Sequence, residues 1–298
     1  MEREDQNLAA TLLLGSSLLF ASAGAAVKLA SATATNEMVV FFRSLFGLVA
    51  LLPFLVRQGS AALRTPHPGQ QVTRALAGLA AMYCFFYAIA HLPLAEAMLL
   101  NYSSPLFIPF IAWLWLGEPI PPGIGWAIGT GFVGIALILK PGLGFFTPAS
   151  VVGLASGLLT ATAMVAIRGL AREEPTTRIV FYFGAVCSAA SAPPLLWGWR
   201  SPSPRTLVLL GAVGALATFG QLLLTRAYAL APAARVGPFT YSTVVFAALL
   251  GWLLWGEVPD RLSVVGALLV ALAGILAIRL LGPRAEEAPE EAIPEAGV

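Results

Sequence analysis

Asn101-Tyr-Ser-Ser-Pro105 and Trp113-Leu-Trp-Leu-Gly-Glu118 both return 139 residues later in this chain, as Thr240-Tyr-Ser-Thr-Val244 and Trp252-Leu-Leu-Trp-Gly-Glu257. With one inserted residue, the correspondence extends toward both ends, where Lys28 matches Arg168. A duplicated hydrophobic unit is typical of transporters, because two related halves can move against each other around a site on their shared axis.

The composition indicates a membrane protein. Of the 298 residues, 58% are apolar and 11% are charged, whereas a soluble domain is about half apolar and a quarter charged. Ten apolar stretches are each about 20 residues long, enough to cross the hydrocarbon layer. They span residues 8–31, 38–56, 71–90, 94–116, 120–140, 149–171, 178–199, 206–229, 233–255 and 262–281.

These stretches predict an all-α membrane protein with ten transmembrane helices. Each half, 8–140 and 149–281, holds five of them. Because five is odd, the second half enters the membrane from the opposite side, and the repeats are inverted. Residues 282–298 form an acidic tail that we expect to be disordered. Nine basic residues against four favour cytoplasmic N- and C-termini.

The Gly-Glu turns have a structural explanation. Gly117 and Gly256 end one helix, and we expect Glu118 and Glu257 to face the positive N-terminal end of the next. Small residues at helical spacing, as in Gly125-x3-Gly129 and Gly153-x3-Gly157, predict close helix contacts.

Polar and aromatic residues within the spans are the candidate substrate site. Many of them have a counterpart in the other half, so they are expected to meet at the axis. Serines and threonines that bond to their own helix, or join neighbouring helices, account for such residues equally well. The candidates are Ser16, Ser17, Tyr83, Tyr87, Asn101, Tyr102, Ser103, Thr160, Gln221, Thr240, Tyr241 and Ser242.

Charged residues are rare in the spans. Glu96, at the start of the fourth span, is the deepest carboxylate. Proton-driven carriers keep an ionisable group on the pathway, so transport down the solute's own gradient is favoured, with Glu96 as the acidic candidate for coupling. Lys28, Arg168 and Arg226 are expected to extend toward lipid headgroups. Arg43 differs from these three basic residues, because the corresponding residue of the second half is the uncharged Phe183.

The paired Gly-Glu turns and Asn101-Tyr-Ser-Ser-Pro105, within ten predicted spans, resemble the drug/metabolite transporter superfamily and its ten-helix metabolite exporters. Overall similarity points to bacterial exporters of aromatic and other amino acids. The resemblance implies an inner-membrane protein whose cavity is lined by helices one, three, four, six, eight and nine, with five and ten as scaffold. Val244 replaces Pro105, so a kink in helix four is not carried over to helix nine.

We therefore predict an exporter of amino acids, aromatic and other neutral ones, and of similar small metabolites. The alternative is a multidrug or other metabolite exporter of the same fold, proton-coupled through Glu96. An intramembrane enzyme is poorly supported, since the chain has two histidines and no HExxH or Gly-x-Ser-x-Gly motif. We expect a small-molecule substrate, membrane lipid around the protein, no cofactor, no metal and no nucleic-acid partner. The sequence leaves the oligomeric state open, and a monomer is the simplest assumption.

Overall fold

The computed structural model describes residues 2–58, 64–117, 123–139, 147–170, 173–230 and 237–281. Within these ranges every regular element is a helix, which confirms the all-α prediction. The first half holds α1 (Glu2–Ala30), α2 (Asn36–Gln58), α3 (Pro68–His91), α4 (Leu94–Asn101), α5 (Ser104–Leu116) and α6 (Ile124–Leu139). The second half holds α7 (Pro148–Leu170), α8 (Thr176–Ser191), α9 (Leu195–Gly198), α10 (Pro204–Leu230), the 3-10 helix η2 (Gly237–Tyr241), α12 (Ser242–Trp255) and α13 (Arg261–Leu281). Glu118, the tail from 282 and the side chain of Arg168 lie outside the described part.

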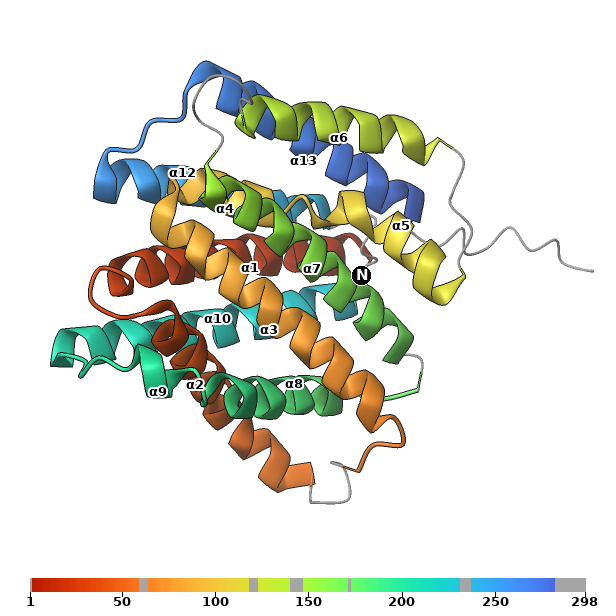
Figure 1. The fold of residues 1–298 in the computed structure, drawn as a ribbon. Helices are drawn as coiled ribbons and strands as arrows, with labels where there is room; N and C mark the ends of the chain where they lie inside the picture. Colours follow the sequence, from red (N-terminus) through yellow and green to blue (C-terminus); the bar gives the residue numbers. More distant parts are fainter. Residues whose placement is uncertain are drawn as a thin grey trace, which may run out of the picture.

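The helices interlock across the two halves. In Figure 1, α6 and α13 lie together along the upper edge, and α2, α8 and α10 form the lower part. The most extensive contacts join α1 to α10, α3 to α7, and α6 to α13. Each of these pairs takes one helix from each half, so the buried core is shared between the halves.

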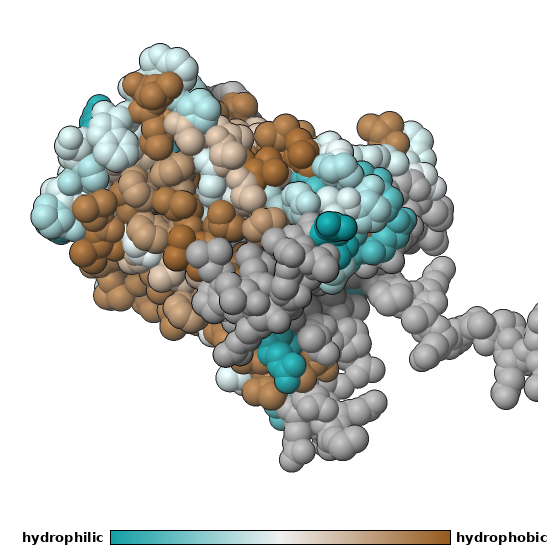
Figure 2. Space-filling model, turned by 90° about the horizontal axis from the view of Figure 1, so that it is seen from below, coloured by the Kyte–Doolittle hydropathy of each residue, from teal (hydrophilic) through white to brown (hydrophobic). Residues whose placement is uncertain are grey.

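Five segments of the described chain are long and apolar enough to cross a membrane: Asn7–Ala30, Pro68–His91, Leu94–Trp115, Pro148–Ile167 and Pro204–Leu224. Shorter apolar helices accompany them. Figure 2, a view of the lower face, shows hydrophobic residues across the middle and hydrophilic ones toward the two ends. This distribution suits a protein surrounded by lipid.

Two predicted helices are interrupted. The stretch 94–116 divides into α4 and α5 at Tyr102 and Ser103, because Pro105 has no N–H to donate to the helix. The stretch 178–199 ends as α8 at Ser191, and Pro193-Pro194 allows only the short α9 after it. The break in 94–116 agrees with the kink expected at Pro105, whereas the expectation of one continuous helix over 178–199 was wrong.

The second half has its own irregularity. There α12 is preceded by the 3-10 turn Gly237–Tyr241, although Pro105 has no counterpart at Val244. We did not expect the stretch 233–255 to share the break of 94–116; in the structure its described part begins with this 3-10 turn, and residues 231–236 lie outside the described part. A Gly-Pro pair at Gly237 and Pro238 lies within this turn.

Glycines mark some of the helix crossings. A Cβ on Gly134 would lie 2.7 Å from the Gly266 carbonyl oxygen, and one on Gly266 would lie 2.6 Å from that of Gly134, so α6 and α13 cross backbone to backbone. A Cβ on Gly157 would likewise lie 2.6 Å from the Leu100 carbonyl oxygen. Gly125 and Gly129, by contrast, have no atom of the described residues within 4 Å of an added Cβ, so the close contact predicted there is not found in the described part of the chain.

Candidate functional site

The irregular segments of the two halves, Tyr102-Ser103 and the 3-10 turn that ends at Tyr241, lie next to each other. The hydroxyl of Tyr241 donates a hydrogen bond to the Tyr102 carbonyl oxygen at 3.3 Å, and the two ring centroids are 6.4 Å apart. Tyr241 is buried against α13, where its hydroxyl fills the position that a Cβ on Gly274 would take. Two tyrosines at corresponding positions thus touch at the points where their helices are irregular.

Asn101 joins the first break to α7. Its amide nitrogen donates to Ser156 Oγ at 3.1 Å and to Thr160 Oγ1 at 3.0 Å. Asn101 is half-buried in this position. Because α7 approaches closely at Gly157, the amide and the two hydroxyls form one polar cluster between α4 and α7.

Most of the predicted serines bond to backbone carbonyls. Ser16 donates to Gly220 at 2.8 Å and so joins α1 to α10, while Ser17 reaches Phe239 at 3.4 Å. Ser103 and Ser242 bond back to Leu100 and Phe239, both at 2.6 Å. These hydroxyls stabilise helix packing and helix breaks. Gln221 is exposed on α10, and Thr240 is half-buried in η2.

The two tyrosines of α3 differ from each other. The Tyr83 hydroxyl is buried and has no hydrogen-bond partner among the described residues, so it can still accept or donate a bond. Tyr87 stacks on His91, with ring centroids 4.1 Å apart. The face of the Tyr87 ring is therefore covered by His91 of the same helix.

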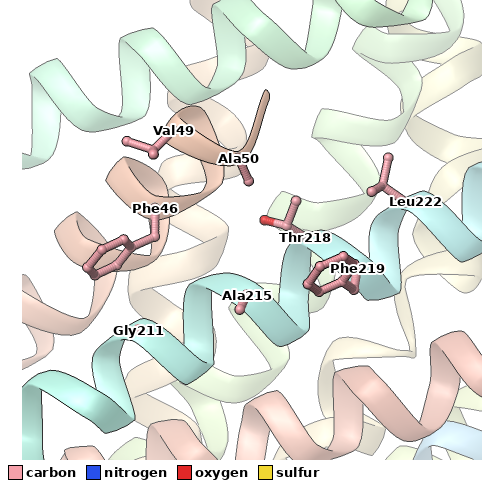
Figure 3. Close-up of a pocket in the computed structure, with 8 residues that line it drawn as sticks. All are labelled: Phe46, Val49, Ala50, Gly211, Ala215, Thr218, Phe219 and Leu222. Carbon is pink, nitrogen blue, oxygen red and sulfur yellow. The ribbon is translucent and has the colours of Figure 1, made fainter. Parts of the chain in front are cut away.

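Two apolar cavities flank the core. One, of about 340 Å³, lies between α12 and α13 and includes Tyr241 and Ser242. The other, of about 300 Å³, lies between α2 and α10 and is lined by Phe46, Val49 and Ala50 of α2 and by Thr218 and Phe219 of α10 (Figure 3). Sequence reasoning missed this second cavity, because apart from Thr218 its residues are apolar and Phe46 and Phe219 resemble ordinary packing residues.

An ion pair holds one end of the bundle. Lys28 Nζ forms a salt bridge with Glu257 and donates to the Leu92 carbonyl at 2.7 Å. The other Glu257 oxygen accepts the Leu94 N–H at 2.8 Å. The ring of Trp255 lies 5.1 Å from Lys28 Nζ. We call these five residues the Lys28–Glu257 cluster; it ties α1, the start of α4 and the end of α12 together.

This cluster corrects two expectations. Lys28 does not extend to lipid, since its side chain is 12% exposed and paired with a carboxylate. Glu257 faces the positive N-terminal end of α4 and not that of the following helix α13. The start of α13 is capped instead by Asp260, whose carboxylate accepts from the N–H groups of Leu262 and Ser263. Gly117 and Gly256 do end their helices in the left-handed conformation, with φ of 65° and 68°.

Glu96 lies close to this end as well. It accepts a hydrogen bond from Ser263 Oγ at 3.1 Å, and the same hydroxyl lies 3.0 Å from an Asp260 oxygen. A serine hydroxyl has one hydrogen to donate, so it serves one carboxylate at a time. Within the described ranges, no three His, Cys, Asp or Glu side chains gather as a metal site would require.

Known proteins resemble this chain over most of its length. The pseudopaline exporter of Pseudomonas aeruginosa is 40% identical over 263 residues, which cover 87% of this chain and 92% of that protein. The riboflavin transporter of Rhizobium johnstonii is 32% identical over 248 residues, 82% and 81% of the two chains. The S-adenosylmethionine uptake transporter of Rickettsia prowazekii is 28% identical over 240 residues, 80% and 82%.

A solved crystal structure shares the fold. It covers 93% of this chain and 98% of its own, with a TM-score of 0.62 at 20% identity. The EamA-like transporter family matches residues 7–140 and 147–279. The relatives above are named as transporters and not as enzymes. The chain therefore belongs to the EamA-like transporter family, within the drug/metabolite transporter superfamily, and is a membrane transporter.

Proposed function

We propose that this protein exports amino acids, aromatic and other neutral ones among them, and similar small metabolites across the bacterial inner membrane by alternating access. The observation that carries the proposal is the contact between Tyr102 and Tyr241 at two corresponding helix breaks. In inverted-repeat carriers, broken helices at the midplane form the substrate site. Tyrosine rings and hydroxyls there suit a small solute with an apolar part.

The proposed architecture is ten transmembrane helices in two inverted repeats, 8–140 and 149–281, with both termini in the cytoplasm. On this topology the Lys28–Glu257 cluster lies at the outer end and closes that side, so the described conformation is shut toward the outside. Support comes from the cross-half packing of α1 with α10 and of α3 with α7. Cysteines introduced between α2 and α3 should react only from the cytoplasm, and labelling from outside in intact cells would contradict this topology.

We propose export as the direction of transport, because the relative that is 40% identical is named as an exporter. Transport needs no ion gradient in this proposal, because a tenfold solute ratio supplies about 1.4 kcal/mol. The second candidate is a larger metabolite as substrate, favoured by the riboflavin and S-adenosylmethionine transporters among the relatives.

Counterflow in proteoliposomes tests the proposal. Vesicles that contain the purified protein and an unlabelled solute should accumulate the labelled form of the same solute. The screen covers the twenty amino acids, riboflavin and S-adenosylmethionine. Accumulation of amino acids would support the first candidate. Accumulation of only the two larger solutes would replace it with the second, and none at all would refute both.

A further inference from the structure

Two arginines lie together between α2, α3 and α8; Arg74 is buried and Arg43 is half-buried. The guanidinium carbon of Arg74 lies 3.8 Å from the centroid of the Phe183 ring, and that of Arg43 lies 5.7 Å from the same centroid. Arg74 is 9% exposed. We call Arg43, Arg74 and Phe183 the arginine cluster.

The sequence explains how the ring reaches both cations. Phe183 occupies the position in the second half that Arg43 occupies in the first, and the two face each other where α2 packs on α8. Gly78 lets the ring lie against α3, since a Cβ there would be 2.8 Å from the ring edge. These two corresponding positions therefore carry one charge, whereas two identical halves would carry two.

The donors of this cluster are not satisfied. Arg74 Nε and Nη1 are buried and have no hydrogen-bond partner among the residues that the structure describes. An aromatic face attracts the cation but accepts none of its five in-plane N–H groups in the way an oxygen does. Buried polar groups ordinarily have partners, so these two nitrogens indicate an absent acceptor.

The acids at the starts of α8 and α2 lie next to other residues. Glu174, buried at the turn before α8, accepts from Thr65 and Gln71 and lies 3.9 Å from Arg178. Glu37 lies in the first turn of α2, where its carboxylate is next to Gly198. Within the described chain, no salt bridge joins either acid to the arginine cluster.

Two cations without a carboxylate are costly in a low-dielectric interior unless an anion joins them. We infer that the arginine cluster binds a further carboxylate of the transported solute, beyond the one that every amino acid carries, so that the carrier prefers acidic solutes over neutral ones of the same size. Arginine suits this role because its planar fork matches a carboxylate with two hydrogen bonds. The inference rests on the proposed function and extends it from neutral amino acids to carboxylate-rich metabolites.

Thermal unfolding of the purified full-length protein in detergent tests the site without transport. The probes are glutamate and glutamine at matched concentrations, which differ in one carboxylate. Glutamate should raise the Tm more than glutamine does, because a ligand that binds only the folded state stabilises it. Arg74→Met should remove this difference, with a loss of glutamate affinity of about tenfold or more. Arg205→Met, at an exposed position at the start of α10, should keep it.

The ligand-free variants provide a second readout. Arg74→Met replaces an unpaired buried charge by an apolar chain of similar length, so its ligand-free Tm should equal or exceed that of the parent. A clearly lower Tm would mean that Arg74 has a structural partner, and would overturn the inference. Equal increases in the Tm of the parent protein with glutamate and with glutamine would also overturn the inference.

A lipid phosphate could be the anion instead of a solute carboxylate. Stabilisation by phosphatidylglycerol micelles that requires Arg74, with none by glutamate, would identify the lipid and overturn the inference. A different result is expected if the proposed function is wrong but the arginine cluster does bind a carboxylate. Counterflow would then be absent for every solute, while the Arg74-dependent glutamate shift would remain.

Discussion

The Lys28–Glu257 cluster and the arginine cluster are both charged and mostly buried, but only the first has its charges matched. Lys28 pairs with Glu257, and each also bonds to the backbone at the turn from α3 to α4. Arg43 and Arg74 share one phenylalanine ring, and two Arg74 nitrogens lack acceptors among the described residues. The matched cluster fixes three helix ends in place, while the unmatched one retains capacity to bind an anion.

This difference suits an alternating-access carrier. A closed end needs contacts within the protein that form in one state and separate in the other, and an ion pair between helix ends can do both. A binding position needs groups left unsatisfied until the solute arrives. We therefore propose that the first cluster acts in closure and the second in recognition, and each of the following substitutions tests one of these two roles.

The largest effect is expected from Glu257→Gln, which breaks the matched cluster. It leaves Lys28 mostly buried without a counter-charge, a loss of about 3 kcal/mol in the free energy of unfolding. Counterflow should fall about tenfold or more, since the closed state forms less often. Unfolding in detergent and counterflow in vesicles measure the two effects.

The double variant Lys28→Met with Glu257→Met is the control for this prediction. Removing both charges should restore most of the stability, because neither is left unpaired. Counterflow should stay low if the pair acts in closure. Full recovery of counterflow along with stability would reduce the cluster to a packing role.

Part of this arrangement was predictable from the sequence. The repeat placed Tyr102 and Tyr241 at corresponding positions, and Gly117 and Gly256 at helix ends, because local patterns and backbone preferences act over a few residues. The partner of Lys28 was not predictable, since Glu257 is 229 residues away and only the packing of α1 against α12 brings them together. Periodicity likewise gave no sign that Phe183 lies over two arginines from other helices.

Next in size is Gly78→Ala, which disturbs the unmatched cluster without touching a charge. The added methyl would lie 2.8 Å from the Phe183 ring, and overpacking of this kind costs about 1–2 kcal/mol. The displaced ring no longer orients both guanidinium groups, so the glutamate-induced Tm shift should shrink. Gly69→Ala is the matched control in the same helix, with open space around it; an equal loss in both variants would contradict the role of the ring.

A smaller effect is expected for Asn101, because its polar contacts involve no charged group. Asn101→Ala removes two hydrogen bonds between α4 and α7, each worth about 0.6 kcal/mol in a membrane protein. Stability should fall by about 1 kcal/mol, because Ser156 keeps its bond to the Gly153 carbonyl. Thr162→Ala, whose hydroxyl bonds only within its own helix at Leu158, should leave unfolding unchanged. A loss for Asn101→Ala as large as that for Glu257→Gln would mean that charge is not what distinguishes the clusters.

The smallest effect is expected from Glu96→Gln, next to the matched cluster. The glutamine carbonyl can still accept the bond that Ser263 Oγ donates to Glu96, and a surface-end carboxylate contributes little to stability, about 0.5 kcal/mol or less. In the proposed mechanism Lys28 and Glu257 act in closure and Arg43 and Arg74 in recognition, so transport does not require protonation of Glu96. Vesicles without a pH gradient should therefore show counterflow at parental rates with this variant. If counterflow instead requires a proton gradient and Glu96→Gln abolishes that requirement, a third charged group drives the cycle, and the division between a matched and an unmatched cluster would no longer describe how this carrier works.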